Sequence, residues 1–464
     1  MKSIVSRQSS RLGGLLLVAL ATFHASAFGQ DISLEERIVA LEGQASGYVD
    51  NSYLFLIGGL IVMLMAAGFC CLEAGLVRSK NAAMQSMKNV ALFSVSGLMF
   101  WLVGYSMAYP GEATALNGLL GIAPAIWNGG DMSVAGADGY APASDWFFQM
   151  VFVATAASIV SGTVAERVKL WPFLAFTAIL TAFIYPIVAS WEWGGGYLDS
   201  AWGFSDFAGS TLVHSTGGWA ALIGAIIIGP RAGKYFGKQI NPMPGSNIPL
   251  AALGTFILWF GWFGFNGASE LAAGGPESIN HVAQIFANTN MAAVGGVLGA
   301  MVLTSVLYKG KIDATMVFNG AIGGLVSITA EPLAPSMGAS VLIGAVGGVL
   351  VVLTVPLLDK FKIDDVVGAI PAHLVCGIWG TLIVAASHGN AIMPPAPDAE
   401  GAIGVSYIGQ LVGVGLTGVF VCIASTIIWS LLKMTIGVRV SEEEELVGLD
   451  KTEVGLEAYP EFSN

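Results

Sequence analysis

The chain has 464 residues, of which 55% are hydrophobic and 11% are charged, and its formal net charge is −12. Soluble domains carry about 25% charged residues, so this composition excludes an ordinary soluble protein and predicts an all-α protein embedded in a lipid bilayer. The acidic balance argues against nucleic acid as a partner, because the phosphate backbone is recognised by basic side chains.

The N-terminus has the layout of a secretory signal peptide. Basic residues precede an apolar stretch over 12–23, and the small residues of 25–27 then form a cleavage site. We therefore expect residues 1–27 to be a signal peptide that is cleaved after Ala27, which would leave the mature N-terminus outside. The alternative is an uncleaved first helix, although this stretch is short for a membrane span.

After the signal peptide, eleven apolar stretches predict eleven transmembrane helices, each near the ~20 residues that cross the hydrocarbon layer. They cover residues 53–77, 90–109, 145–164, 171–190, 209–229, 247–268, 288–308, 314–330, 338–358, 366–387 and 403–432. We assign residues 28–433 to one transmembrane domain.

Basic residues mark every second loop. Lysine or arginine follows each odd-numbered span, for example at Arg78, Arg167 and Arg231, whereas the five intervening loops contain neither. Because positive residues are retained on the cytoplasmic side, the pattern predicts an N-out, C-in topology with an odd number of spans.

Residues 434–464 form an acidic C-terminal tail, which we expect to be cytoplasmic. Four consecutive glutamates at 442–445 are followed by further acidic residues, and this segment supplies much of the net charge. A run of this kind is typical of a solvated, mobile segment.

Two histidines lie inside predicted spans. His214 and His373 each sit in an uncharged apolar run, whereas His24 falls in the signal peptide and His281 and His388 fall in or beside loops. An ionisable side chain at membrane depth is costly, so it indicates a substrate or proton pathway. The alternative is a neutral imidazole that only bonds two helices together.

The segments around these histidines resemble each other. Asp206 precedes His214 by eight residues, Asp364 precedes His373 by nine, and glycines and a tryptophan follow each histidine. The two spans are five helices apart and so cross in opposite directions. This predicts a five-plus-five inverted repeat followed by a final helix, with the site at the repeat interface.

Metal and haem do not fit the pair well. A metal ion would need three or four ligands. A bis-histidine haem would bring further histidines or a propionate-binding arginine, and the predicted spans contain neither. We expect no cofactor and no metal. The interpretation that remains is a hydrogen-bonded imidazole pair, which can accept a proton and pass it on.

Three motifs carry a family resemblance: DFAGSTLVH at 206–214, WFGFNGAS at 262–269 and DDVVGAIPAHLVCGIWG at 364–380. AERVKL at 165–170, WGGG at 193–196 and VRVSEEEELVGLD at 438–450 support them. Over nearly its mature length the chain resembles the ammonium transporters of the ammonium transporter/methylammonium permease/Rhesus family, of the bacterial type. The resemblance implies eleven helices, a homotrimer with one pore in each subunit, and a multi-pass protein of the bacterial inner membrane.

The resemblance also implies roles for individual residues. Outer recruitment of ammonium falls to Trp193, Ser269, Phe148, Phe152 and Asp206. Cation–π attraction and a hydroxyl acceptor distinguish ammonium, which donates hydrogen bonds, from potassium, which does not. For Asp206 we favour bonding to backbone amides over direct binding of the cation.

The gate and the pore wall are assigned in the same way. The stacked pair Phe152 and Phe265 would close the vestibule, and Trp262, His214 and His373 would line the path below it. Any single phenylalanine or tryptophan could equally be a packing or interfacial residue, so only the motifs single these out.

The function expected is transport of ammonium or ammonia, and of methylammonium, by a protein that is not an enzyme. Ammonium loses its proton at the outer vestibule, ammonia crosses the apolar pore, and the twin histidines relay the proton. An ammonium sensor with little transport and a Rhesus-type neutral gas channel remain as alternatives. A cytoplasmic trimeric nitrogen-signalling protein of the PII type is a further expected partner, and the tail is expected to dock on a neighbouring subunit.

Overall fold

The computed structural model describes residues 34–111, 114–115, 118–121, 125–130, 139–399 and 401–462. The chain divides into two compact units, Met1–Ser46 and Gly47–Asn464. Apart from the first residues of helix α2 (Leu34–Leu76), every feature discussed below belongs to the second unit. The predicted signal peptide over 1–27, with His24, lies outside the described residues.

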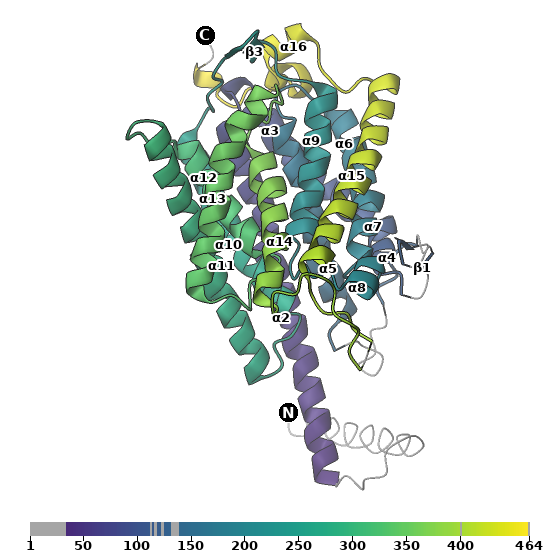
Figure 1. Cartoon of the computed structure of the whole chain (residues 1–464). Helices are drawn as coiled ribbons and strands as arrows, with labels where there is room; N and C mark the ends of the chain where they lie inside the picture. The colour runs from purple at the N-terminus through teal and green to yellow at the C-terminus, as the bar shows by residue number, and fades with distance from the viewer. Residues whose placement is uncertain are drawn as a thin grey trace, which may run out of the picture. The chain divides into compact units, whose positions relative to one another are not determined.

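Helices make up most of the described part of the second unit (Figure 1). The α-helices are α2 (Leu34–Leu76), α3 (Ala82–Met99), α4 (Tyr105–Ala108), α5 (Pro142–Thr163), α6 (Leu170–Ile179), α7 (Tyr185–Ser190), α8 (Tyr197–Trp202), α9 (Thr216–Ile228), α10 (Ile248–Gly267), α11 (Pro276–Leu307), α12 (Ala314–Ile328), α13 (Met337–Lys360), α14 (Cys376–Ser387), α15 (Tyr407–Thr435) and α16 (Glu442–Val447).

Shorter elements extend or join these helices. The π-helical turns are η3 (Phe100–Gly104), η4 (Leu180–Ile184), η5 (Ser210–Ser215), η7 (Ile370–Val375) and η8 (Asp450–Val454). The 3₁₀ turns are η2 (Ser79–Asn81), η6 (Ala268–Glu270) and η9 (Pro460–Phe462). Two antiparallel hairpins pair β1 (Thr114–Ala115) with β2 (Leu120–Gly121) and β3 (Tyr235–Phe236) with β4 (Gln239–Ile240).

The described residues contain ten helices that are long and apolar enough to cross a membrane. Each overlaps one of the predicted ranges, and the remaining range, 314–330, contains the shorter helix α12 of 15 residues. The protein is therefore a mostly helical, multi-pass membrane protein. An eleventh crossing at α12 stays a prediction.

Predicted and observed ends differ clearly at α11, which begins at Pro276 instead of residue 288. Glu277 and His281 lower the hydropathy of its first turns, although the backbone there is already helical. Pro276 is tolerated because it occupies the first turn, where its missing N–H has no helical partner. Hydropathy thus locates the apolar middle of this helix better than its ends.

Glycines allow the closest helix packing in the unit. A Cβ added at Gly344 of α13 would lie 1.9 Å from the carbonyl oxygen of Ala292 in α11. One added at Gly296 of α11 would lie 2.1 Å from the carbonyl oxygen of Gly320 in α12. Small residues let membrane helices approach until their backbones touch, which explains the abundance of glycine inside apolar spans.

The acidic tail packs against its own chain. Val440 and Leu449 are buried with Met84 of α3. The carboxylate of Asp450 accepts hydrogen bonds from the backbone N–H groups of Ala83 and Met84, at 3.1 and 2.8 Å. Asp450 therefore satisfies free amides in the first turn of α3, where a carboxylate is favoured. The expectation of a solvated segment does not hold for these residues, because apolar side chains alternate with the acidic ones.

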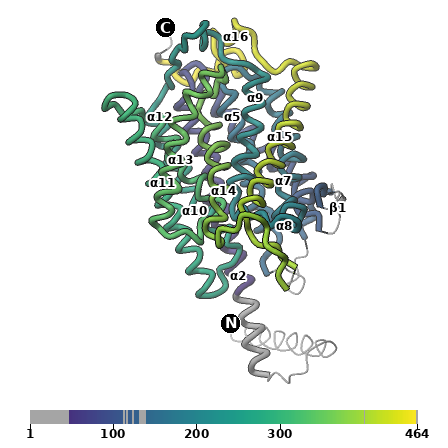
Figure 2. The backbone as a smooth tube through the Cα atoms, viewed as in Figure 1, coloured from purple at the N-terminus to yellow at the C-terminus, as the bar shows by residue number. Residues whose placement is uncertain are grey.

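Glu445, at the end of the glutamate run, is also buried. Its side chain accepts hydrogen bonds from Arg439 Nη2 at 2.8 Å and from the backbone N–H of Ala232 at 2.7 Å. In Figures 1 and 2, α16 lies at the same end of the helix bundle as the segment that follows α9. We call this end, which carries residues 438–459, the tail end of the bundle.

Replacing Gly344 with alanine should destabilise the protein, because the new methyl group forces α13 away from α11. Over-packing of this kind costs about 1–3 kcal/mol, which lowers the apparent melting temperature of the detergent-purified protein by a few degrees. Gly338→Ala in the same helix is the matched control, since a Cβ there meets nothing within 4 Å. Equal melting temperatures for the two variants would contradict this packing.

Candidate functional site

The two intramembrane histidines face each other. His214 Nδ1 and His373 Nδ1 are 3.2 Å apart, and the ring centroids are separated by 5.2 Å at an interplanar angle of 26°. Both side chains are buried. At this distance one Nδ1 carries the proton and the other accepts it, so the pair in its neutral form shares a single hydrogen bond. His214 Nε2 is buried and has no hydrogen-bond partner in the structure.

Both histidines sit on π-helical turns at the start of a helix. His214 lies in η5, which continues into α9, and His373 lies in η7, which continues into α14. A π-turn widens the helix and changes the direction of its side chains, which is why such turns occur at functional sites. Pro371 lies in the first turns of η7, where the helix tolerates its missing N–H.

A glycine four residues after each histidine permits the close approach of the two turns. A Cβ on Gly218 would lie 2.6 Å from the Leu374 side chain, and a Cβ on Gly377 would lie 2.3 Å from the Ser210 carbonyl oxygen. Each glycine thus makes room for the π-turn of the other histidine. The matched positions support the predicted repeat, although its inverted orientation remains a prediction.

Asp206 holds the first π-turn in place. Its Oδ1 accepts hydrogen bonds from the backbone N–H groups of Gly209 and Ser210, at 3.1 and 2.7 Å. Its Oδ2 accepts those of Thr211 and Leu212, at 2.7 and 2.8 Å. Burial raises the pKa of Asp206 to about 6, although these four bonds favour its charged form. The carboxylate is therefore occupied by backbone amides, in line with a structural role.

Asp365 holds the second π-turn, and the sequence pairing of Asp206 with Asp364 is wrong. Asp365 precedes His373 by eight residues, the same spacing as in the first segment. Its carboxylate accepts hydrogen bonds from the N–H groups of Gly368 and Ile370, at 3.2 and 2.7 Å, and from Thr163 Oγ1 at 3.1 Å.

Asp364 belongs instead to a buried network of charges. Its two oxygens pair with Arg231 Nε and Nη2, at 2.8 and 2.9 Å. Burial alone would raise the pKa of Asp364, but the bonds and charge of Arg231 bring it well below its usual range. Arg231 also pairs with Glu166 at 3.0 Å, and Glu166 pairs with Arg78 at 2.5 Å.

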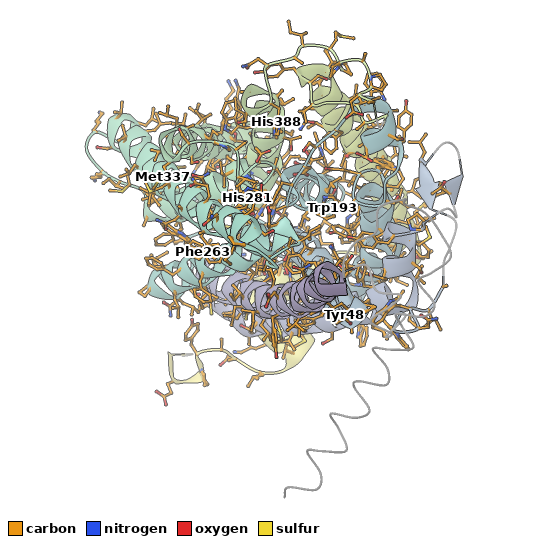
Figure 3. All side chains as sticks on the ribbon, turned by 90° about the horizontal axis from the view of Figure 1, so that it is seen from below. Tyr48, Trp193, Phe263, His281, Met337 and His388 are labelled. Carbon is orange, nitrogen blue, oxygen red and sulfur yellow. The ribbon has the colours of Figure 1, made fainter. Side chains whose placement is uncertain are left out.

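A series of aromatic rings leads to the histidine pair. Phe152 and Phe265 are stacked, with centroids 3.9 Å apart and planes at 14°. Phe148 meets the edge of Phe152 at 4.7 Å, and Trp193 meets Phe152 at 6.1 Å. Figure 3, which views the bundle from the end opposite the tail, labels Trp193.

The same series continues on the other side of the stacked phenylalanines. Phe265 lies 5.2 Å from the ring of His214, and Trp262 stacks on that ring at 5.0 Å and 19°. Trp262 Nε1 donates a hydrogen bond to Thr329 Oγ1 at 2.8 Å, which fixes the indole. The structure thus brings five of the sequence-predicted residues into one continuous series: Trp193, Phe152, Phe265, His214 and His373.

The side chains of Ser269 and Trp193 each donate a hydrogen bond to a backbone carbonyl oxygen near this series. Ser269 Oγ donates to the carbonyl oxygen of Phe265 at 2.8 Å, so its lone pairs remain the groups that can accept another hydrogen bond. Trp193 Nε1 donates to the carbonyl oxygen of Asp206 at 3.1 Å, which leaves the indole face as its free recognition surface.

Four residues near the site were missed by the sequence reasoning: Asp365, Thr329, Phe69 and Glu192. Phe69 of α2 lies 5.8 Å from His373, ring to ring. Glu192 accepts a hydrogen bond from the backbone N–H of Asp206 at 2.7 Å, and burial raises its pKa well above the usual value. An acidic residue beside Trp193 in a short apolar loop could have been noticed, whereas no pattern separates Phe69 from other phenylalanines.

Within the described residues, no group of three or more histidine, cysteine, aspartate or glutamate side chains is arranged to hold a metal ion.

Known proteins resemble this chain over most of its length. The family model described as the Ammonium Transporter Family matches residues 53–459. Ammonium transporter Amt2 of Archaeoglobus fulgidus is 40% identical over 433 residues, which cover 88% of this chain and 87% of that protein. Ammonium transporter Amt1 of Haloferax mediterranei is 36% identical over 436 residues, covering 89% and 80%.

Solved structures share the fold. A structure named "Sensor Amt Protein" superposes with a TM-score of 0.77 at 35% identity, over 88% of this chain and 98% of that one. The structure of Mep2 from Candida albicans superposes with a TM-score of 0.73 at 24% identity, over 87% and 88%, which speaks for the fold alone.

Replacing Asp206 with alanine should strongly destabilise the site, because four buried N–H groups lose their acceptor. A single buried donor left unpaired costs about 1–3 kcal/mol. Asp206→Asn should fall between wild type and alanine, since its one carbonyl oxygen can still accept two of the four bonds. Thermal melting of the purified proteins measures the order, with Asp199→Ala at an exposed position as the control. Wild-type stability in the alanine variant would refute the capping role.

Proposed function

Because this chain belongs to the ammonium transporter family, we propose that it moves ammonium or ammonia, and methylammonium, across a membrane. The observation that carries the proposal is the continuous series from Trp193 through the stacked phenylalanines to the histidine pair. A cation-attracting aromatic face stands at one end and a proton-accepting pair lies in the buried interior.

Recruitment takes place around Trp193 and Ser269. The exposed part of the indole attracts a cation, an interaction worth up to about 2 kcal/mol when the cation loses water. The Ser269 hydroxyl accepts one of the four hydrogen bonds that ammonium donates, which potassium cannot supply. Phe148 and Phe152 add aromatic faces beside this position, and Asp206 acts indirectly through the backbone it holds.

Ammonium gives up its proton before it enters the pore. The stacked rings of Phe152 and Phe265 leave no polar group to replace the water around a charged ion, and an unpaired buried charge is very costly. Neutral ammonia crosses this stretch at far smaller cost.

The histidine pair carries the proton separately from ammonia. One imidazole receives a proton while the other already shares its Nδ1 hydrogen bond, so a proton added on one side releases one on the other. Net movement of ammonia plus one proton makes the transport electrogenic. The buried pair is neutral at rest because burial disfavours an imidazolium.

The surroundings of the pore complete the proposal. The basic loops lie at the tail end, so we place that end in the cytoplasm and the N-terminus outside, in the inner membrane of a bacterium. The proposed assembly is a homotrimer with one pore in each subunit. Residues 1–27 are proposed to be cleaved from the mature chain. A PII-type protein that binds the tail end remains part of the proposal.

An ammonium sensor is the second candidate, and one observation favours it. The solved structure named "Sensor Amt Protein" is 35% identical to this chain and covers 88% of it. A sensor would bind ammonium at the same vestibule and move little of it. A Rhesus-type neutral gas channel is less well supported, since Trp193 and the Ser269 hydroxyl suit the capture of a cation.

His214→Asp and His373→Ala should each lose selective, proton-coupled transport. Removal of a proton-transfer group commonly costs about 100-fold in rate. Ammonium-evoked current and internal pH are measured together in proteoliposomes, with wild type as reference. Unchanged current and unchanged selectivity over potassium in both variants would exclude the relay.

Trp193→Leu and Ser269→Ala should raise the ammonium concentration that gives half-maximal transport. Loss of ~1.4 kcal/mol of binding corresponds to a tenfold change, within the range of a cation–π contact. Trp171→Leu, at an exposed position at the start of α6, serves as the control. Half-saturation at the wild-type concentration in both site variants would contradict the recruitment role.

A further inference from the structure

A buried pair of opposite charges lies outside the series just described. Glu73 is in the last turn of α2 and Lys88 is in α3, and both side chains are 1% exposed. Charges at such depth are costly and need a compensating reason for their presence. The ammonia path and the histidine relay, as proposed above, use neither residue.

Glu73 is held by neutral donors. Its Oε2 accepts hydrogen bonds from Asn89 Nδ2 at 2.7 Å, from Ser161 Oγ at 2.8 Å and from Gln85 Nε2. These side chains come from α3 and α5, so the carboxylate joins three helices. All three bonds go to Oε2, which leaves Oε1 as the atom free to exchange a proton.

Lys88 supplies the counter-charge in a fixed place. Its Nζ donates to the carbonyl oxygen of Ser161 at 2.9 Å and lies 4.9 Å from the centre of the Phe173 ring. A carbonyl oxygen and an aromatic face are groups that a small cation would seek here, and the lysine ammonium already occupies both. The cluster therefore does not have room for an ammonium ion, but it can take up a proton.

The cluster lies beside the histidine pair. Phe69, which contacts the ring of His373, is one helical turn before Glu73 on the same face of α2. On the other side, a Cβ added at Gly162 would lie 3.1 Å from Glu73 Oε1 and 2.4 Å from Val367. Val367 belongs to the turn that Asp365 holds, six residues before His373.

Glu73 also lies toward the tail end. Gln85 and Lys88 belong to the first two turns of α3, whose N-terminus is bonded to Asp450 of the tail. A proton that passes the histidines in the direction of the tail end therefore has Glu73 as a buried carboxylate on this side of the path.

We propose that Glu73, neutralised by Lys88, is a second proton-handling site that follows the histidine pair toward the tail end. The inference rests on the function proposed above. A proton released by the pair converts the Glu73 carboxylate to the neutral acid. The O–H bond then breaks as ammonia takes the proton, which forms the fourth N–H bond of ammonium and restores the carboxylate. Lys88 stays protonated throughout.

The test uses the full-length protein in proteoliposomes and measures two quantities, ammonium-evoked current and ammonia entry detected as internal alkalinisation. Glu73→Gln removes proton exchange and keeps the shape, and Glu73→Gln/Lys88→Met also removes the unpaired charge. We expect both to lose at least about tenfold of the current while ammonia still enters. Glu73→Asp should retain current with a shifted pH profile.

Two control variants separate proton transfer from packing. Ser94→Ala removes a hydrogen bond to the carbonyl oxygen of Val90 in the same helix α3, outside the cluster, and no titratable group, so its current should persist. Glu277→Gln makes the same chemical change at an exposed position at the start of α11. Thermal melting identifies any variant that fails to fold, in which case the comparison of Glu73→Asp with the wild type decides.

The outcomes distinguish the two levels of the proposal. Absence of current in the wild type would refute the proposed electrogenic function itself. Wild-type current with equal current in both glutamine variants would overturn the role of Glu73 alone. Parallel loss of current and ammonia entry in folded Glu73 variants, Glu73→Asp included, would also overturn it, because it would mean a structural role.

Discussion

The site depends on the need to satisfy backbone amides in a dry interior. At the start of η5, four consecutive N–H groups converge on the carboxylate of Asp206. Two N–H groups at the start of η7 bond to Asp365 in the same way. Where water is excluded, an unpaired amide costs on the order of several kcal/mol, so each aspartate determines the local path of the chain. The positions of both imidazoles follow from these two anchors.

The two ends of the bundle use charge differently. Near Trp193, polar side chains bond mainly to backbone and leave aromatic faces and a hydroxyl available to a solute. Toward the tail end, a chain of ion pairs joins the buried residues Glu166, Arg231 and Asp364 to the partly exposed Arg78. The tail itself bonds to α3. The first arrangement suits capture of a cation, whereas the second ties helix ends together. Glu73 and Lys88 share features of both ends: their opposite charges are buried, as in the ion pairs, but they lie beside the proposed path of the solute.

Composition and charge placement were sufficient to predict a many-span helical protein and the location of nearly every span. The two intramembrane histidines were also recognisable, because an ionisable group stands out in an apolar run. Asp365 was missed because Asp364 and Asp365 are adjacent, and only the hydrogen bonds show which one holds the turn. Phe69 could not be selected among 24 phenylalanines. The π-turns and the reciprocal fit of Gly218 and Gly377 depend on contacts between distant segments, which no local pattern encodes.

The central claim is that ammonium is captured as a cation and crosses as ammonia with a separate proton. The most direct measurement is the current evoked by equal gradients of ammonium, methylammonium and potassium in proteoliposomes that contain the wild-type protein. We expect currents with ammonium and methylammonium and none with potassium. A comparable potassium current, or ammonia entry without any current, would contradict it.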